Sequence, residues 1–223
     1  MAKQHGILVD IGSCMGCGVC VIACKQENDL PPHLDDKPGT KGIAWNQVLS
    51  IHEGIHPDLS INYLCLHCMH CENPLCVESC PVAGAIYKRE DGLVLIDKGK
   101  CDGCKDRPEG PKCVPACPYG AIQFNGEKGV VEACTLCVHL IDAGLEPACV
   151  RACIGGALTF GDFNDPKSKV SEKVRAAGDR VFVLNPERGA NPSVRYIRPQ
   201  GVSLDRVSCL DKAKVMYGFD KQG

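Results

Sequence analysis

The sequence has little of what builds a large apolar core or a membrane span. Only 5 % of its 223 residues are aromatic, and Trp45 is the single tryptophan. Its longest apolar runs, such as residues 92–96, have the length of a strand and fall far short of the ~20 residues that span a bilayer. Basic and acidic residues nearly balance, 25 against 27, without a basic run. These features argue against a transmembrane helix and against a protein that binds nucleic acid by neutralising phosphates.

An export signal is also missing near the start of the sequence. No long apolar stretch precedes Cys14, the first cysteine, so we expect a cytoplasmic protein. The periplasm is the alternative, because a folded subunit can be exported together with a partner that carries the signal. Disorder is not expected, since 44 % of the residues are hydrophobic and low-complexity runs do not occur. The fold must therefore be stabilised by something besides apolar area.

Cysteine is the residue that the sequence has in excess, with 18 copies. Disulfide scaffolds are typical of small secreted chains, and structural zinc sites use cysteines in separate pairs. Here the first group contains four cysteines, Cys14, Cys17, Cys20 and Cys24, with two, two and three residues between them. This is the spacing of ferredoxins that hold two [4Fe–4S] clusters, in which the fourth cysteine ligates the neighbouring cluster.

Three further groups of four repeat this pattern with wider loops. They are Cys68, Cys71, Cys76 and Cys80; Cys101, Cys104, Cys113 and Cys117; and Cys134, Cys137, Cys149 and Cys153. Each contains the element Pro-x-Cys-x-x-x-Cys, which begins at Pro74, Pro111 or Pro147, and each is followed by a glycine and a short apolar segment. Such an internal repeat favours iron–sulfur clusters over zinc and disulfides. Sixteen cysteines in four groups predict four [4Fe–4S] clusters.

Two cysteines remain outside the groups. Cys65 lies three residues before Cys68, so a frame that begins with Cys65, Cys68 and Cys71 is an alternative. That frame leaves out Cys76 of the repeated element, and we therefore prefer the later one. Cys209 stands alone near the end of the sequence and is expected to be an ordinary thiol.

Histidines and basic residues near the groups are candidate neighbours of a cluster. His67 and His70 lie between cysteines and are expected to form hydrogen bonds or to lie at the surface, with iron binding as the alternative. Each oxidised cluster with its four thiolates carries a charge of about −2, so four clusters take the formal charge from −2 to about −10. Cations beside the ligands can offset this charge, or else be solvated at the surface: Lys25, Lys105, Arg107 and Arg151.

The groups must pair, because each fourth cysteine serves another cluster. The second and third groups end in Cys-Pro, at Cys80 and Cys117, whereas the first and fourth groups do not. This symmetry favours a nested arrangement, with the second group paired to the third and the first to the fourth. The spacing along the chain favours it only weakly, and the other two pairings stay open on these grounds.

These motifs resemble the four-cluster electron-transfer subunits of molybdopterin oxidoreductases of the dimethyl sulfoxide reductase type. Similar proteins are the small subunits of polysulfide, arsenate and tetrathionate reductases and of pyrogallol–phloroglucinol transhydroxylase. The resemblance covers most of residues 6–198, with matches at residues 14–28, 68–97, 134–153, 161–166, 181–189 and 192–197. Ile154, where the family usually has proline, and the long loop of the third group are departures. Neither departure removes a ligand.

The resemblance implies a ligand set for each cluster. Cluster 1 has Cys14, Cys17, Cys20 and Cys153; cluster 2 has Cys134, Cys137, Cys149 and Cys24; cluster 3 has Cys68, Cys71, Cys76 and Cys117; cluster 4 has Cys101, Cys104, Cys113 and Cys80. It also implies a large catalytic subunit with a molybdenum or tungsten bis-pterin cofactor. A membrane quinone-reactive subunit or a soluble carrier is the further partner.

On this hypothesis the chain transfers electrons and is not itself an enzyme. Clusters with four cysteine ligands have no open position, and the sequence has no phosphate-binding glycine loop or Ser/His/Asp set. A free-standing polyferredoxin is one alternative. The iron–sulfur subunit of a hydrogenase or of a formate-oxidising complex is another.

We expect an α+β fold of two nested ferredoxin-like lobes with a C-terminal extension. The first lobe comprises residues 1–62 and 125–164, the second is inserted at 63–124, and residues 165–223 add a helix and a tail that docks on a partner. Expected strands lie at 6–10, 45–51, 84–88, 93–97, 121–125 and 157–160, with helical turns that carry each fourth cysteine; residues 25–64 hold one strand. A helix over 165–177 is expected to be capped by Asp165, with Pro166 in its first turn, and to end at Gly178.

Overall fold

The computed structural model describes residues 2–31, 43–201 and 214–217. Short helices and small sheets alternate along these residues, so the expected mixed α and β content is confirmed. Within the described part of the chain, no helix is long and apolar enough to cross a membrane.

A four-stranded sheet joins segments that are far apart in the sequence. Its strands in spatial order are β8 (Leu158–Asp162), β1 (His5–Asp10), β10 (Arg195–Ile197) and β9 (Val181–Phe182). Strand β1 pairs antiparallel with β8 and parallel with β10. Ile7 and Val9 face the main core, while Leu8 packs on the other face against Val170 and Ala177 of helix α6 (Lys169–Ala177). Alternation along β1 therefore buries both faces of the sheet.

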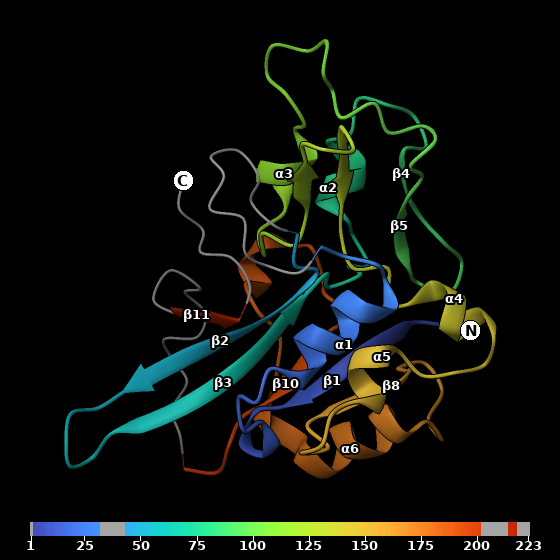
Figure 1. Cartoon of the computed structure of the whole chain (residues 1–223). Coiled ribbons are helices and arrows are strands. Elements are labelled where there is room, and N and C mark those ends of the chain that lie inside the picture. The colour runs from blue at the N-terminus through green and yellow to red at the C-terminus, as the bar shows by residue number, and fades with distance from the viewer. Residues whose placement is uncertain (1, 32–42, 202–213, 218–223) are drawn as a thin grey trace.

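A long hairpin forms the second sheet and projects from the body of the molecule (Figure 1). Strands β2 (Asn46–Glu53) and β3 (Ser60–His67) pair antiparallel, with Asn46 opposite His67 and Val48 opposite Cys65. Strand β11 (Lys214–Tyr217) pairs with the other edge of β2. The base of the hairpin is tied to the first sheet, because the Tyr196 hydroxyl of β10 donates a hydrogen bond to the Cys65 carbonyl at 3.1 Å.

The cysteine-rich segments fold into short helices and two-stranded sheets. The helices are α1 (Val19–Glu27), α2 (Leu75–Glu78), α3 (Cys113–Ala116), α4 (Val138–Asp142) and α5 (Ala148–Arg151). The sheets pair β4 (Ile86–Lys88) with β5 (Val94–Ile96), and β6 (Gln123–Asn125) with β7 (Val130–Glu132). Single 3-10 turns occur at η1 (Ile11–Ser13), η2 (Gly178–Arg180) and η3 (Pro186–Arg188).

The helices pack in pairs that cross the sequence order. Helix α1 packs against α5, and α2 packs against α3. In Figure 1, α2, α3, β4 and β5 lie towards one end of the molecule, while α1, α5, β1, β8 and α6 lie towards the other. An ion pair of 2.8 Å between Glu27 of α1 and His139 of α4 adds to the link between the first and fourth groups. The fold thus brings the first cysteine group to the last and the second to the third.

All six expected strands are present, as β1, β2, β4, β5, β6 and β8, but the expected helices need correction. Helix α6 spans Lys169–Ala177 with Gly178 as its C-cap, as expected for its end, and its N-cap is Ser168, whose hydroxyl accepts the Ser171 N–H at 3.3 Å. The prediction of Asp165 as the cap was wrong. Helical turns carry the third cysteine of the last three groups, at Cys76, Cys113 and Cys149, and end before the fourth. Only α1 contains its fourth cysteine.

The prediction of a single strand in residues 25–64 was also wrong, because β3 already begins at Ser60. The structure further adds β7, β9, β10 and β11. Strand β11 lies along β2 of the same chain, whereas the tail beyond Arg198 was expected to lie along a partner. The remainder of the tail, including Cys209, is outside the described residues.

The Tyr196 hydrogen bond gives a first testable expectation. Tyr196 is fully buried, so Tyr196→Phe removes a buried bond worth about 1 kcal/mol and should lower the apparent melting temperature by about 2–4 °C for a chain of this size. Anaerobic differential scanning calorimetry of the cluster-loaded protein at a fixed scan rate measures the change. Tyr87→Phe is the matched control, because Tyr87 is 40 % exposed, and it should leave the melting temperature unchanged. Equal shifts in the two variants would contradict a role for the bond.

Candidate iron–sulfur site

The first set of thiols combines the first and fourth groups. A pocket of about 380 Å³, which includes space open to the solvent, is lined by Cys14, Cys17, Cys20 and Cys153. Burial raises the pKa of the Cys14 thiol, and the thiolates of Cys20, Cys153 and Cys17 raise it further. Three cysteines of the N-terminal loop and Cys153 therefore surround the same pocket.

A second set lies beside the first and again draws on both groups. Burial raises the pKa of Cys24 well above its ordinary value, with further contributions from Cys134 and Cys137. The amide nitrogen of Asn28 lies 3.8 Å from both Cys24 Sγ and Cys137 Sγ. Burial also raises the pKa of Cys149, to which the charge on Cys24 contributes. Cys24 thus stands among three cysteines of the fourth group.

The third set combines the second and third groups. Burial raises the pKa of Cys71 to about 12 and that of Cys76 to about 11, and Cys117 is the strongest charged neighbour of both. Burial likewise raises the pKa of Cys68, which has Cys117 and Cys76 among its neighbours. Cys117 of the third group therefore completes a set with three cysteines of the second.

The fourth set has the reverse composition. Burial raises the pKa of Cys113 to about 12, and the charges of Cys80, Cys101 and Cys104 raise it further. Here Cys80 of the second group joins three cysteines of the third. The structure thus brings together, set by set, the same cysteines that the family resemblance assigns to clusters 1 to 4; iron ligation itself stays a prediction.

Charge interactions between the thiols link the sets in a row. Burial is the main cause of the raised pKa of four thiols, and in each case a thiol of a neighbouring set raises the pKa further. Cys20 acts in this way on Cys24 and Cys149, Cys134 acts on Cys68, and Cys76 acts on Cys113. Each link joins neighbours in the order first, second, third, fourth. Among the described residues, no three Cys, His, Asp or Glu side chains are close enough to share a single metal ion.

One backbone turn recurs in all four groups. The residue before the second cysteine has a positive φ in each of them, at Gly16 (68°), His70 (42°), Gly103 (62°) and Leu136 (57°). Two of these residues are not glycine. A left-handed conformation of a bulky residue costs about 1–3 kcal/mol and persists only where the surroundings enforce it. The turn directs a backbone N–H to sulfur: Leu136 N–H donates to Cys134 Sγ at 3.3 Å. A loop that wraps a sulfur-ligated group needs such donors.

Known proteins resemble this chain over most of its length. The family described as "4Fe-4S dicluster domain" matches residues 59–163. One relative, from the tetrathionate reductase of Salmonella typhimurium, is 39 % identical over 194 residues, which cover 87 % of this chain and 72 % of that protein. Another, from the sulfite dehydrogenase of Allochromatium vinosum, is 39 % identical, with 87 % and 82 % covered. The arsenate respiratory reductase iron–sulfur subunit of Shewanella sp. is 34 % identical, with 88 % and 97 % covered.

The chain belongs to the iron–sulfur subunits of the molybdopterin oxidoreductases. It is an electron-transfer subunit without catalytic residues of its own, and it holds [4Fe–4S] clusters. This membership confirms the resemblance found in the motifs.

Two buried histidines of the iron–sulfur subunit lie next to its ligand candidates. His70 Nδ1 accepts the Val94 N–H at 3.0 Å, so the expected hydrogen-bonding role is confirmed for this residue. His67 is 2 % exposed, and within the described residues neither ring nitrogen has a hydrogen-bond partner. Burial lowers the pKa of His67 to about 4, so the neutral ring keeps one N–H donor that faces no protein acceptor. Such an orphaned donor beside Cys68 fits a site that contains further acceptor atoms, such as cluster sulfur.

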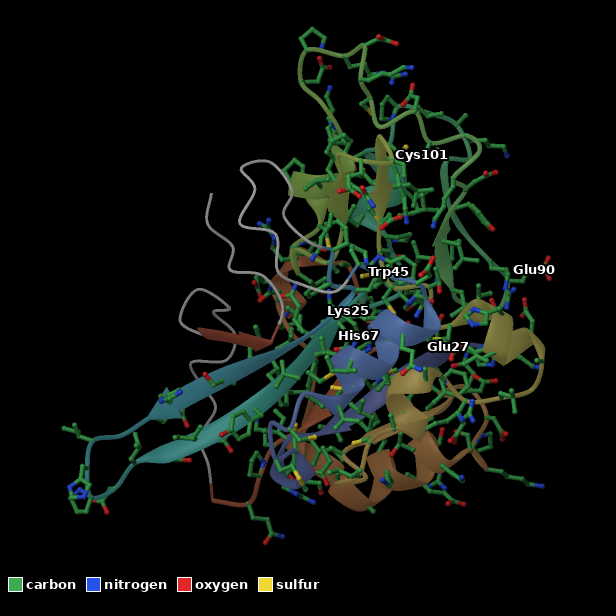
Figure 2. The ribbon with its side chains drawn as sticks, viewed as in Figure 1. Lys25, Glu27, Trp45, His67, Glu90 and Cys101 are labelled. Carbon is green, nitrogen blue, oxygen red and sulfur yellow. The ribbon has the colours of Figure 1, made fainter. Side chains whose placement is uncertain are left out.

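Of the four candidate cations, two lie against thiols. Lys25 is 8 % exposed, and its ammonium donates to the carbonyls of Pro31 at 2.9 Å and Ile43 at 3.1 Å. Burial lowers the pKa of Lys25, while the neighbouring Cys24 thiolate raises it. Arg107 interacts with Asp102 at 2.8 Å and with Cys104. Lys105 and Arg151 are exposed, which is the alternative considered for all four. Figure 2 shows Lys25 and His67 in the interior and Cys101 towards the end that carries α3.

Gly16 makes the importance of the recurring turn testable. A Cβ at Gly16 would lie 2.7 Å from the ring of Tyr63 and would require a φ of +68°. Gly16→Ala should therefore distort the loop of the first set and lower the iron content by about four atoms per chain. Gly110→Ala is the matched control, because it imposes a similar φ of +64° with no heavy atom within 4 Å. Iron analysis after anaerobic purification distinguishes them, and full iron in Gly16→Ala would show that the loop tolerates the change.

Proposed function

We propose that this iron–sulfur subunit holds four [4Fe–4S] clusters, one in each set of thiols. The first cluster is ligated by Cys14, Cys17, Cys20 and Cys153, and the other three by the second, third and fourth sets as described. The observation that carries the proposal is the gathering of sixteen thiols into four sets of four, each drawn from two groups. The spacing within each group and the match to a 4Fe-4S dicluster domain favour a polynuclear cluster over zinc.

The two halves of the site are nested. The packing of α1 on α5 and of α2 on α3 supports this arrangement, because each pair of helices unites the two groups that exchange a cysteine. The first lobe then comprises residues 1–62 and 125–164, and residues 63–124 form the inserted second lobe. The separation of α2, α3, β4 and β5 from α1, α5, β1 and β8 in Figure 1 supports the same division.

The row of clusters carries electrons between two partner proteins. Bound clusters supply one-electron redox chemistry, and the protein's part is to hold them in the order first, second, third, fourth. The charge interactions between neighbouring sets support this order. The first set lies near the surface, since Cys17 is exposed and Ile154 is 71 % exposed. A partner that docks there reaches the row directly.

The partner on one side is a large catalytic subunit with a molybdenum or tungsten bis-pterin cofactor. The names of the relatives support it, because they are subunits of reductases and of a dehydrogenase. On the other side we expect a membrane quinone-reactive subunit or a soluble carrier. The complex is cytoplasmic, or periplasmic if the subunit is exported with a partner that carries the signal.

The nested pairing has a direct test by serine substitution. Cys76→Ser and Cys117→Ser come from different groups but should change the same cluster signal, whereas Cys80→Ser, from the same group as Cys76, should change another. Electron paramagnetic resonance during an anaerobic redox titration separates the signals. If Cys76→Ser and Cys80→Ser alter one signal together, the groups do not exchange their fourth cysteines.

The partner has a separate test in the native material. The wild-type protein should elute in size-exclusion chromatography with a large protein that contains molybdenum or tungsten, and elemental analysis should find about sixteen irons per copy of the iron–sulfur subunit. A lone brown protein of 23.9 kDa with the same iron content would instead support a free polyferredoxin. Much less iron in fully loaded material would contradict the four-cluster proposal.

A further inference from the structure

Cys65 belongs to none of the four sets, yet it lies against the first. It is 2 % exposed and lines the same cavity as Cys14, Cys17, Cys20 and Cys153. Its Sγ atom lies 4.0 Å from Cys20 Sγ. The cavity of the first set therefore contains a fifth sulfur, and this sulfur comes from β3, outside the cysteine groups.

The hairpin fixes the direction of this side chain. Cys65 stands opposite Val48, and residues directly opposite one another share a face of the sheet; Val48 also lines the cavity. The Cys65 carbonyl accepts from Tyr196 at 3.1 Å. Asn46 connects Cys65 to Cys20, because its side-chain oxygen accepts the Cys65 S–H at 3.0 Å and its nitrogen donates to the Cys20 carbonyl at 3.3 Å. Cys65 is thus held with its sulfur towards Cys20.

The contact between the two sulfurs has a defined polarity once Cys20 binds iron. An iron-bound cysteine is a thiolate, which can only accept a hydrogen bond. A free cysteine keeps its proton at neutral pH and is a weak donor. A charged acceptor attracts the donor more strongly than a neutral amide oxygen does. In the loaded protein the Cys65 S–H therefore turns from Asn46 towards Cys20, or is shared between them.

We propose that Cys65 is a positioning residue that donates a hydrogen bond to the Cys20 thiolate and raises the reduction potential of the first cluster. This inference rests on the proposed ligation of that cluster by Cys20. One-electron reduction adds one negative charge to the cluster and its thiolates. A donor to one of these sulfurs stabilises the reduced form more than the oxidised form, and hydrogen bonds to sulfur are among the factors that set such potentials.

A pair of substitutions separates the hydrogen bond from packing. Cys65→Val fills a similar volume and has no donor, whereas Cys65→Ser keeps a donor at the same place. Cys65→Val should lower one of the four midpoint potentials, so that the ratio of reduced to oxidised cluster at a fixed potential falls about tenfold, equivalent to about 59 mV for one electron. Cys65→Ser should restore most of the shift. Redox titration with dithionite as the reductant, monitored by electron paramagnetic resonance, measures all three proteins.

A spectroscopic signature identifies the bond itself. After exchange into deuterium oxide, electron–nuclear double resonance of the reduced first cluster should show an exchangeable coupling from the Cys65 thiol in the wild type. The same coupling should be absent from Cys65→Val, although iron content and melting temperature stay near the wild-type values. If the thiol serves packing alone, the wild-type cluster shows no such coupling and Cys65→Val changes only the stability.

The outcomes separate this inference from the proposed function. Full iron and four unshifted potentials in Cys65→Val overturn the inference and leave the four-cluster proposal intact. Loss of iron in Cys65→Val, with the signal of a three-iron cluster, makes Cys65 itself a ligand and also overturns it. Wild-type protein that lacks the first cluster when fully loaded contradicts both. Cys65→Ala provides a second variant without a donor if the valine protein fails to fold.

Discussion

The exchange of fourth cysteines between groups, which we propose for this iron–sulfur subunit, is the constraint on which its arrangement depends. Cys153 must reach the loop that begins at Cys14, and Cys24 must reach the loop near Cys137, so the first and last cysteine segments have to lie together. The pairing of β1 with β8 and the packing of α1 on α5 satisfy this requirement. The second and third groups satisfy it between themselves through α2 and α3.

Burial of the thiols couples cluster loading to folding. Burial raises the pKa of most of the ligand candidates, including Cys71, Cys76 and Cys113, although the thiolate is the form that binds metal. The positive charge of iron offsets the free-energy cost of burying these thiolates when the cluster is present. The left-handed conformations of His70 and Leu136 add backbone strain that the surrounding sulfur contacts must also balance. Cluster binding therefore contributes more to the folding stability of this protein than it would to a domain whose apolar core packs without a cofactor.

The parts of the structure that could be predicted are those that short sequence motifs determine. Cysteine spacing and the repeated Pro-x-Cys element lie within short segments, and they define the four groups of cysteines. The division of these groups into sets that exchange a cysteine came from the family resemblance. The cap of α6 was mistaken because Asp165 accepts the Lys167 N–H at 2.8 Å in a preceding turn, which leaves Ser168 as the cap. Strand β3 was missed because Cys65 and His67 occupy inward positions that apolar residues usually take. Strand β10 has three residues, and only its pairing with β1 and β9 makes it a strand.

The ammonium of Lys25 links three separate points of the backbone. It holds the carbonyls of Pro31 and Ile43, so both of these points meet at the helix turn that follows Cys24. One buried cation therefore ties the helix that carries this ligand candidate to two other places in the chain, and removal of its charge would release both of them at once.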